Sequence, residues 1–176
     1  SNQGVETSLG GANMTGNVIL YHMNEASGNI TDYSGNNYDA VISDVDYGVD
    51  GILDRALDFD GINNYVYYDV ADETIGLYSL SFWVKSNSFY QTEYTGVFST
   101  SDAGGDADSF QIDFDLNGNY RMMHADYSFI FGKVMKDWQM ITLTSDGSTH
   151  KGYLNGVLVN QSATVTNTFF EFYKIG

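Results

Sequence analysis

Two carboxylates stand at a spacing that could serve glycoside chemistry. Asp113 and Asp115 lie two positions apart in residues 110–115, and side chains with that spacing share one face of a β-strand. Paired carboxylates act in glycosidases as acid, base or nucleophile. The polar position before them is Gln111, which can act neither as a nucleophile nor as a general acid. We therefore expect no catalysis here, and a strand whose polar face turns to solvent.

Oxygen-rich turns are the second feature with chemical potential. Residues 32–37 and 58–61 concentrate Asp and Asn side chains beside glycines. Ca²⁺ prefers such carboxylate, amide and carbonyl oxygens, but the same side chains also cap turns through their own backbone hydrogen bonds. The sequence leaves both interpretations open. The candidate metal ligands are Asp32, Asn36, Asp58 and Asp60.

A third group of residues could contact a ligand directly. Residues 101–109 form a polar, glycine-rich stretch with three aspartates, which predicts an exposed loop, and loops of this kind often carry ligand contacts. Aromatic side chains in residues 89–94 and 127–129, including Phe89 and Phe129, could stack on sugar rings and hydrogen-bond at their polar ends. The candidate ligand-binding residues are Tyr90, Tyr94, Asp102, Asp106, Asp108 and Tyr127.

Other ionisable residues give no specific signal. Residues 44–51 superficially resemble an EF-hand loop, but Arg55 stands where that loop needs a bidentate Glu. We expect an acidic, solvated loop there. His22, His124 and His150 share no spacing on one element and no adjacent serine, so we expect them to be structural.

The composition excludes several classes of partner. The chain has 176 residues, with 7 Lys and Arg against 23 Asp and Glu, and a net charge of −16. So few cations argue against binding to nucleic acid or to an anionic membrane surface. No cysteine is present, which removes disulfides and thiolate metal sites. No stretch approaches the roughly 20 apolar residues of a membrane-spanning helix.

The elements that must position these residues are β-strands. Short segments rich in β-branched and aromatic residues predict strands at residues 17–22, 65–68, 80–85, 110–115, 139–144 and 151–154. Asx-Gly pairs such as Asp146-Gly147 and Asn155-Gly156 supply the positive φ angles that tight hairpins need. No helical periodicity competes with this pattern, which favours an all-β sandwich or jelly roll.

A set of motifs follows in a recognisable order. They are residues 20–25, 27–28, 32–37, 56–61, 65–66, 80–85, 138 with 141–144, 153–157 and 174–176. In this order the chain resembles the laminin-G-like branch of the concanavalin-A-like lectin/glucanase jelly rolls. The resemblance covers roughly residues 17–176 and is specific for the fold, whereas this fold serves many functions.

The resemblance implies an all-β, two-sheet antiparallel jelly-roll sandwich over residues 17–176, preceded by a linker at residues 1–16. Relatives usually continue past the final Ile-Gly, so we expect their last strand to lie outside this chain. Trp83 and Trp138 are expected to pack in the core, and a structural calcium is expected near residues 32–37. Catalytic members carry a Glu-x-Asp-x-x-Glu strand, which this chain lacks.

The leading hypothesis is a non-catalytic recognition or adhesion module of a secreted or cell-surface protein. It would bind carbohydrate, with calcium as a candidate cofactor, and neither bind nucleic acid nor insert into a membrane. The alternative is a structural or assembly domain of a surface, pilus or virion protein, whose partner is a neighbouring protein chain.

Overall fold

The computed structural model describes residues 8–9, 12–13, 16–89, 95–100, 110–124, 127–162 and 168–176. Every regular element among these residues is a β-strand, as the sequence pattern predicts. The chain divides into two compact units, residues 1–68 and 69–176, and β6 (Tyr65–Ile75) crosses from one to the other. No helix in the described part is long and apolar enough to cross a membrane.

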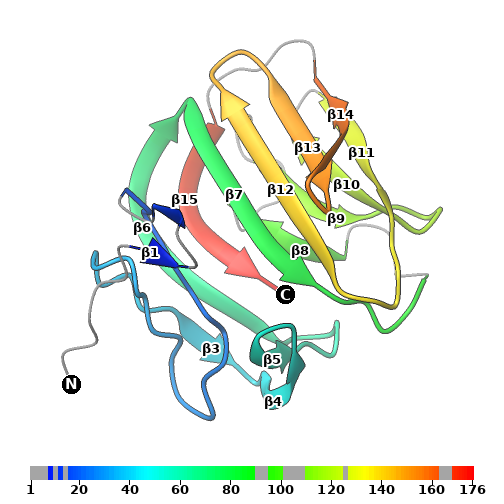
Figure 1. The fold of residues 1–176 in the computed structure, drawn as a ribbon. Coiled ribbons are helices and arrows are strands. Elements are labelled where there is room, and N and C mark those ends of the chain that lie inside the picture. The colour runs from blue at the N-terminus through cyan, green and yellow to red at the C-terminus, as the bar shows by residue number, and fades with distance from the viewer. Residues whose placement is uncertain are drawn as a thin grey trace. The chain divides into compact units, whose positions relative to one another are not determined.

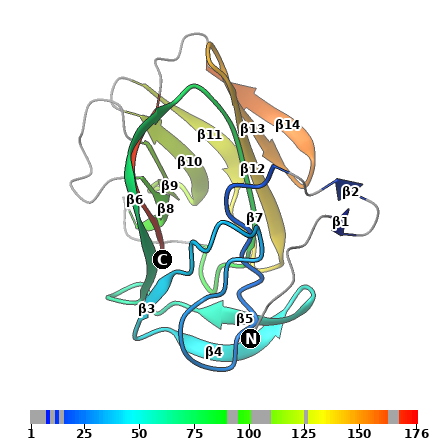
Figure 2. The ribbon, with the colours of Figure 1, turned by 90° about the vertical axis from the view of Figure 1, so that its left-hand side faces the viewer.

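The first unit is built from short pairs of strands. Its elements are β1 (Ser8–Leu9), β2 (Ala12–Asn13), β3 (Val41–Ser43), β4 (Asp46–Gly51), β5 (Asp54–Asp58) and the start of β6. β1 pairs with β2, β3 pairs with the start of β6, and β4 forms an antiparallel hairpin with β5 (Figure 2). The hairpin corrects our expectation of a solvated loop at residues 44–51, because residues 54–58 supply a partner strand that local reasoning did not consider.

The second unit is a sandwich of two sheets. Its remaining strands are β7 (Leu77–Val84), β8 (Gly96–Ser99), β9 (Phe110–Phe114), β10 (Asn119–His124), β11 (Tyr127–Lys133), β12 (Gln139–Asp146), β13 (His150–Leu154), β14 (Val157–Gln161) and β15 (Thr168–Ile175). One sheet has the order β11-β10-β9-β8-β15-β6 in this unit, and the other has the order β14-β13-β12-β7 (Figure 1). The result is the expected all-β antiparallel jelly-roll sandwich.

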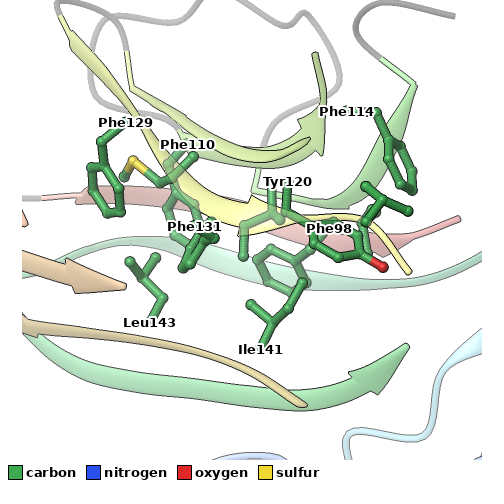
Figure 3. Close-up of a cluster of buried hydrophobic side chains, with 12 residues drawn as sticks. Phe98, Phe110, Phe114, Tyr120, Phe129, Phe131, Ile141 and Leu143 are labelled. Carbon is green, nitrogen blue, oxygen red and sulfur yellow. The ribbon is translucent and has the colours of Figure 1, made fainter. Parts of the chain in front are cut away.

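The core lies between these two sheets. β10 and, from the opposite sheet, β12 bury every second residue, and β9 buries Phe110, Ile112 and Phe114 in the same core. The period of two follows from the pleat of a β-strand. The side chains that meet are mostly aromatic (Figure 3): Phe98, Phe110, Phe114, Tyr120, Phe129 and Phe131 from one sheet, and Ile141 and Leu143 from the other.

Local turn chemistry sets the connections as predicted. Asn155 and Gly156 join β13 to β14 with φ angles of +51° and +78°, which is the pattern of a type I′ hairpin turn. The strands predicted at residues 65–68, 80–85, 110–115, 139–144 and 151–154 are confirmed. The strand predicted at residues 17–22 is wrong, because this segment forms only an isolated bridge, between Tyr21 and Asp32.

Candidate ligand-binding site

Asp32 is the most completely hydrogen-bonded of the predicted metal ligands. Its Oδ1 accepts from the backbone N–H groups of Leu20 (3.0 Å) and Ser34 (2.9 Å), and its Oδ2 accepts from the Ser34 hydroxyl (2.7 Å) and the Tyr38 N–H (3.1 Å). Burial would raise the pKa of this carboxyl, but these hydrogen bonds outweigh burial and lower the pKa below its ordinary value. A carboxylate offers about four acceptor positions, so a cation at Asp32 would have to displace one of these donors.

The other predicted metal ligands also serve their own loops. The Asn36 side-chain amide donates to the carbonyl of Val18 (2.9 Å). Asp60 Oδ1 accepts from the N–H of Ile62 (2.8 Å), and this turn lowers the pKa of Asp60. Asp58 ends β5, opposite Asp46. No group of three or more His, Asp or Glu side chains among the described residues could hold a metal ion, so the four candidates do not converge and the calcium site stays a prediction.

Most of the predicted ligand-binding residues lie outside the part of the chain that the structure describes: Tyr90, Tyr94, Asp102, Asp106 and Asp108. Tyr127 is described, at the start of β11. Its hydroxyl hydrogen-bonds to Nδ1 of His150, and its ring stacks on His124 with 5.0 Å between the ring centroids. Tyr127 is therefore tied into the sandwich through both its polar and its apolar ends.

The two histidines near Tyr127 form a cluster that the sequence did not reveal. His150 is fully buried, and Nε2 of its ring contacts the Tyr78 hydroxyl at 2.7 Å. The rings of His124 and His150 are 6.1 Å apart. Burial, and after it the neighbouring His124, lower the pKa of His150 to about 4, whereas burial raises the pKa of Tyr127. A neutral imidazole between two hydroxyls is a structural element of the core.

A second polar cluster lies on the outer face of β9 and β10. The guanidinium of Arg121 donates to both oxygens of Asp113, from Nε to Oδ1 (2.9 Å) and from Nη2 to Oδ2 (2.8 Å). The Gln111 amide also donates to Oδ2 of Asp113 (2.8 Å). The Asp113 side chain is 0% exposed and that of Arg121 is 14% exposed. The expectation that Asp113 faces solvent is therefore wrong, because Arg121, opposite it on β10, covers it.

Both carboxylate oxygens of Asp115 also accept hydrogen bonds. Its Oδ1 accepts from the backbone N–H groups of Asn117 (2.9 Å) and Asn119 (2.8 Å), and its Oδ2 accepts from the Asn119 amide (2.7 Å). Burial opposes ionisation, but these hydrogen bonds and the charge of Arg121 lower the pKa of Asp115. Both carboxylates are therefore held by donors from their own sheet and its turn.

The outer face of β8–β11 is a candidate surface for a ligand. Register places Gln111 opposite Ser99 on one side and Met123 on the other, and Met123 opposite Ser128. We call this set the polar sheet face: Ser99, Gln111, Asp113, Arg121, Met123, Ser128 and Ile130. The charges of Asp113 and Arg121 cancel in their ion pair. The face therefore has no net charge, and it presents amide, guanidinium and hydroxyl groups beside the apolar side chains of Met123 and Ile130.

The structure places three of the aromatic side chains considered in the sequence. Trp83 was expected in the core, but it is 44% exposed, because β7 turns its even-numbered residues inward and leaves Trp83 outside, opposite Met140. Phe129 was a candidate for an exposed platform, with packing as the alternative, and it is buried in the core. Phe89, another candidate, is 47% exposed.

Comparison with known protein families agrees with the jelly-roll fold. A laminin G family model, described as the concanavalin A-like lectin/glucanases superfamily, matches residues 60–174. The chain belongs to this superfamily. No curated protein matches the sequence.

Several solved structures share the superfamily fold with this chain. Domain 4 of AbnA, a GH43 extracellular arabinanase from Geobacillus stearothermophilus, in complex with arabinotriose, matches with a TM-score of 0.63 and 19% identity over 83% of this chain and 77% of that chain. A point mutant of HCR/D matches with a TM-score of 0.67 and 17% identity over 90% of this chain but 42% of that chain. An S-layer domain-containing protein from Clostridium thermocellum matches with a TM-score of 0.53 and 21% identity over 84% of this chain and 73% of that chain. At these identities the likeness shows the fold alone.

Sequence reasoning missed Arg121 and the His124–His150 pair. Arg121 had a usable signal, since a lone cation in an acidic chain one hairpin away from Asp113 invites pairing across the strands. The histidines had no such signal, because they lie on strands of different sheets and only the packing of the sheets brings them together.

Proposed function

We propose that this chain is a non-catalytic recognition module that binds carbohydrate on the polar sheet face. The proposal includes a location outside the cell, on a surface or in a secreted protein. Residues 90–94 and 101–109, which flank β8 in the sequence, would add the predicted contacts of Tyr90, Tyr94 and the three aspartates. Calcium, if it binds, would stabilise the module without taking part in chemistry.

The Gln111–Asp113–Arg121 network is the observation that carries this proposal. A buried ion pair contributes little net stability compared with apolar residues of the same size, so its position on a sheet face points to a role in recognition. Binding sites typically combine apolar surface with a few fixed polar groups. Because Asp113 holds both Nε and Nη2 of Arg121, the guanidinium is oriented before any ligand arrives.

The comparisons support a saccharide as the ligand and an extracellular setting. The arabinanase domain with this fold was solved with arabinotriose and belongs to an extracellular enzyme, and the S-layer protein also carries the fold. The lowered pKa of Asp115 supports a non-catalytic role, because glycoside hydrolysis needs a protonated carboxylic acid beside the second carboxylate.

The test is a panel of immobilised neutral and acidic polysaccharides, probed with and without Ca²⁺. We expect binding to at least one neutral polysaccharide and no release of reducing sugar. The Gln111→Ala variant should then bind that polysaccharide roughly fivefold more weakly, because a lost hydrogen bond is worth about 1 kcal/mol.

The matched control is Thr142→Ala, which removes a hydroxyl group from the outer face of the other sheet. Its saccharide affinity should equal that of the wild type. Absence of binding across the whole panel, or equal loss in both variants, would contradict the proposed site.

A further inference from the structure

The β4–β5 hairpin carries apolar side chains where polar ones are usual. Its two-residue tip consists of Ile52 and Leu53, which are 45% and 75% exposed. Gly, Asn, Asp and Ser dominate such turns, because they tolerate the backbone geometry and face water. Val49, next to the tip on β4, is 37% exposed. An apolar tip of this kind is typical of a contact surface.

Acidic side chains surround this tip. Asp46, Asp50 and Asp54 are exposed, and Asp46 lies opposite Asp58 across the strands. Arg55 is the only cation of residues 46–58, against four aspartates. We call this set the hairpin tip: Val49, Ile52 and Leu53 with Asp46, Asp50 and Asp54. It combines exposed apolar surface with a net negative charge.

The second unit carries a surface of opposite charge at one end of its sandwich. Phe89, Leu116 and Met135 are 47%, 65% and 45% exposed, on three different loops. These loops touch one another: Lys136 Nζ lies 5.1 Å from the centre of the Phe89 ring. The loop of Leu116 is fixed to the loop of Met135 by a hydrogen bond from the Val134 N–H to the Gly118 carbonyl (3.0 Å).

Cations are concentrated on the same loops. Lys85, Lys133 and Lys136 account for three of the seven basic residues of a chain with a net charge of −16. Asp137 is exposed beside them, and Asp115 is buried with its oxygens taken by Asn117 and Asn119. We call this set the Phe89 surface: Phe89, Leu116 and Met135 with Lys85, Lys133 and Lys136.

We propose that the hairpin tip of one copy of this chain docks on the Phe89 surface of a second copy. Apolar side chains would meet apolar ones, and the aspartates of the tip would face the lysines, so the two surfaces are complementary in charge. Because the two surfaces differ, the contact is head-to-tail and propagates into rings or filaments. This inference does not depend on saccharide binding, which uses the polar sheet face.

The net charge sets the conditions for association. Copies carrying −16 each repel at long range, and this repulsion is screened beyond about 10 Å at 0.1 M salt. Docked apolar groups and close ion pairs act over shorter distances. Association should therefore be measured near 0.1 M salt, where repulsion between the remaining surfaces is reduced.

Two variants and their mixture test the proposal by sedimentation equilibrium. Ile52→Ser with Leu53→Asn removes the apolar tip and introduces residues that favour turns. Phe89→Ser with Lys136→Glu removes the other surface. We expect the wild-type mass to rise with concentration beyond that of a dimer and each variant to remain monomeric. A mixture of the two variants should give a 1:1 dimer and nothing larger, because one intact surface of each kind remains.

Leu158→Ser is the matched control, since Leu158 is an exposed apolar residue of β14 (49%) that belongs to neither surface. It should associate like the wild type. A wild type that stays monomeric at every concentration, a mixture that stays monomeric, or loss of association in the control would each overturn the proposal. Circular dichroism of each variant ensures that the comparison is between folded proteins.

Discussion

His150 makes the stability of the sandwich depend on pH in a predictable window. Its pKa falls from the ordinary value of 6.5 to about 4 in the folded chain. Between these two values the unfolded chain binds more protons than the folded one, so the free energy of unfolding decreases as the pH falls. The contribution is complete above pH 6.5 and is lost by about pH 4. At about 1.4 kcal/mol per pKa unit, the loss amounts to roughly 3 kcal/mol.

Asp32 and Asp115 do not mask this effect. The pKa values of Asp32 and Asp115 are lowered from 3.8, so both groups stay charged between pH 7 and pH 4.5, and their own contributions are lost only at lower pH. The unfolding of the sandwich can be followed by tryptophan fluorescence, because Trp83 and Trp138 are the only tryptophans of the chain and both lie in the second unit.

The experiment is urea unfolding at several pH values from 7.5 to 4.5, for the wild type and for His150→Gln. Glutamine offers a donor and an acceptor to the hydroxyls of Tyr78 and Tyr127 but does not titrate. We expect the variant to be less stable at pH 7.5 and to lose much less stability on acidification. The control is His22→Gln, because the His22 ring stacks on Tyr33 in the first unit and lies outside the His150 cluster. The unfolding free energy of this variant should change with pH as that of the wild type does.

Equal loss of unfolding free energy in the wild type and in His150→Gln between pH 7.5 and 4.5 would refute this reasoning. It would mean that His150 is protonated without opposition in the folded chain, and so that the buried cluster does not exclude charge.

Three further predictions concern packing. Tyr120→Phe should leave stability unchanged or raise it by about 1 kcal/mol in thermal unfolding, because the Tyr120 hydroxyl is buried with no hydrogen-bond partner among the described residues; a clear destabilisation would reveal a partner. Gly152→Ala should cost about 1–3 kcal/mol in urea unfolding, since its new Cβ would lie 2.7 Å from Cδ1 of Phe131. Arg121→Met should cost about 3–5 kcal/mol, because it leaves the Asp113 carboxylate buried and unpaired, and the double variant with Asp113→Leu should recover most of that loss in the same assay.

The strands and turns of this protein could be predicted from the sequence because they depend on near neighbours. The alternation in residues 139–144 matches the pleat of β12, and Asn155-Gly156 adopts positive φ angles by itself. The segment at residues 17–22 has the same kind of composition, but Asp32 takes the Leu20 N–H with a side-chain oxygen. A strand needs a partner for its backbone, and composition does not supply one.

The candidate sites were less predictable, because they depend on register and on packing between sheets. Trp83 is an exception, because it shares its face of β7 with Ser79 and Ser81 while the even-numbered apolar residues pack on the core. The alternation itself therefore points Trp83 outward, and only the family resemblance placed it inside. Asp113 meets Arg121 only through the pairing of β9 with β10, and His124 meets His150 only where two sheets face each other.

The sequence by itself determined that the chain is acidic and all-β, because period-two alternation and turn residues act locally, and the order of its motifs indicated the jelly-roll superfamily by resemblance. Only the tertiary structure decided which polar groups are buried, which carboxylates are neutralised and which aromatic rings face water. Those outcomes are set by contacts between strands far apart in the chain, and such contacts exist only once both sheets have packed.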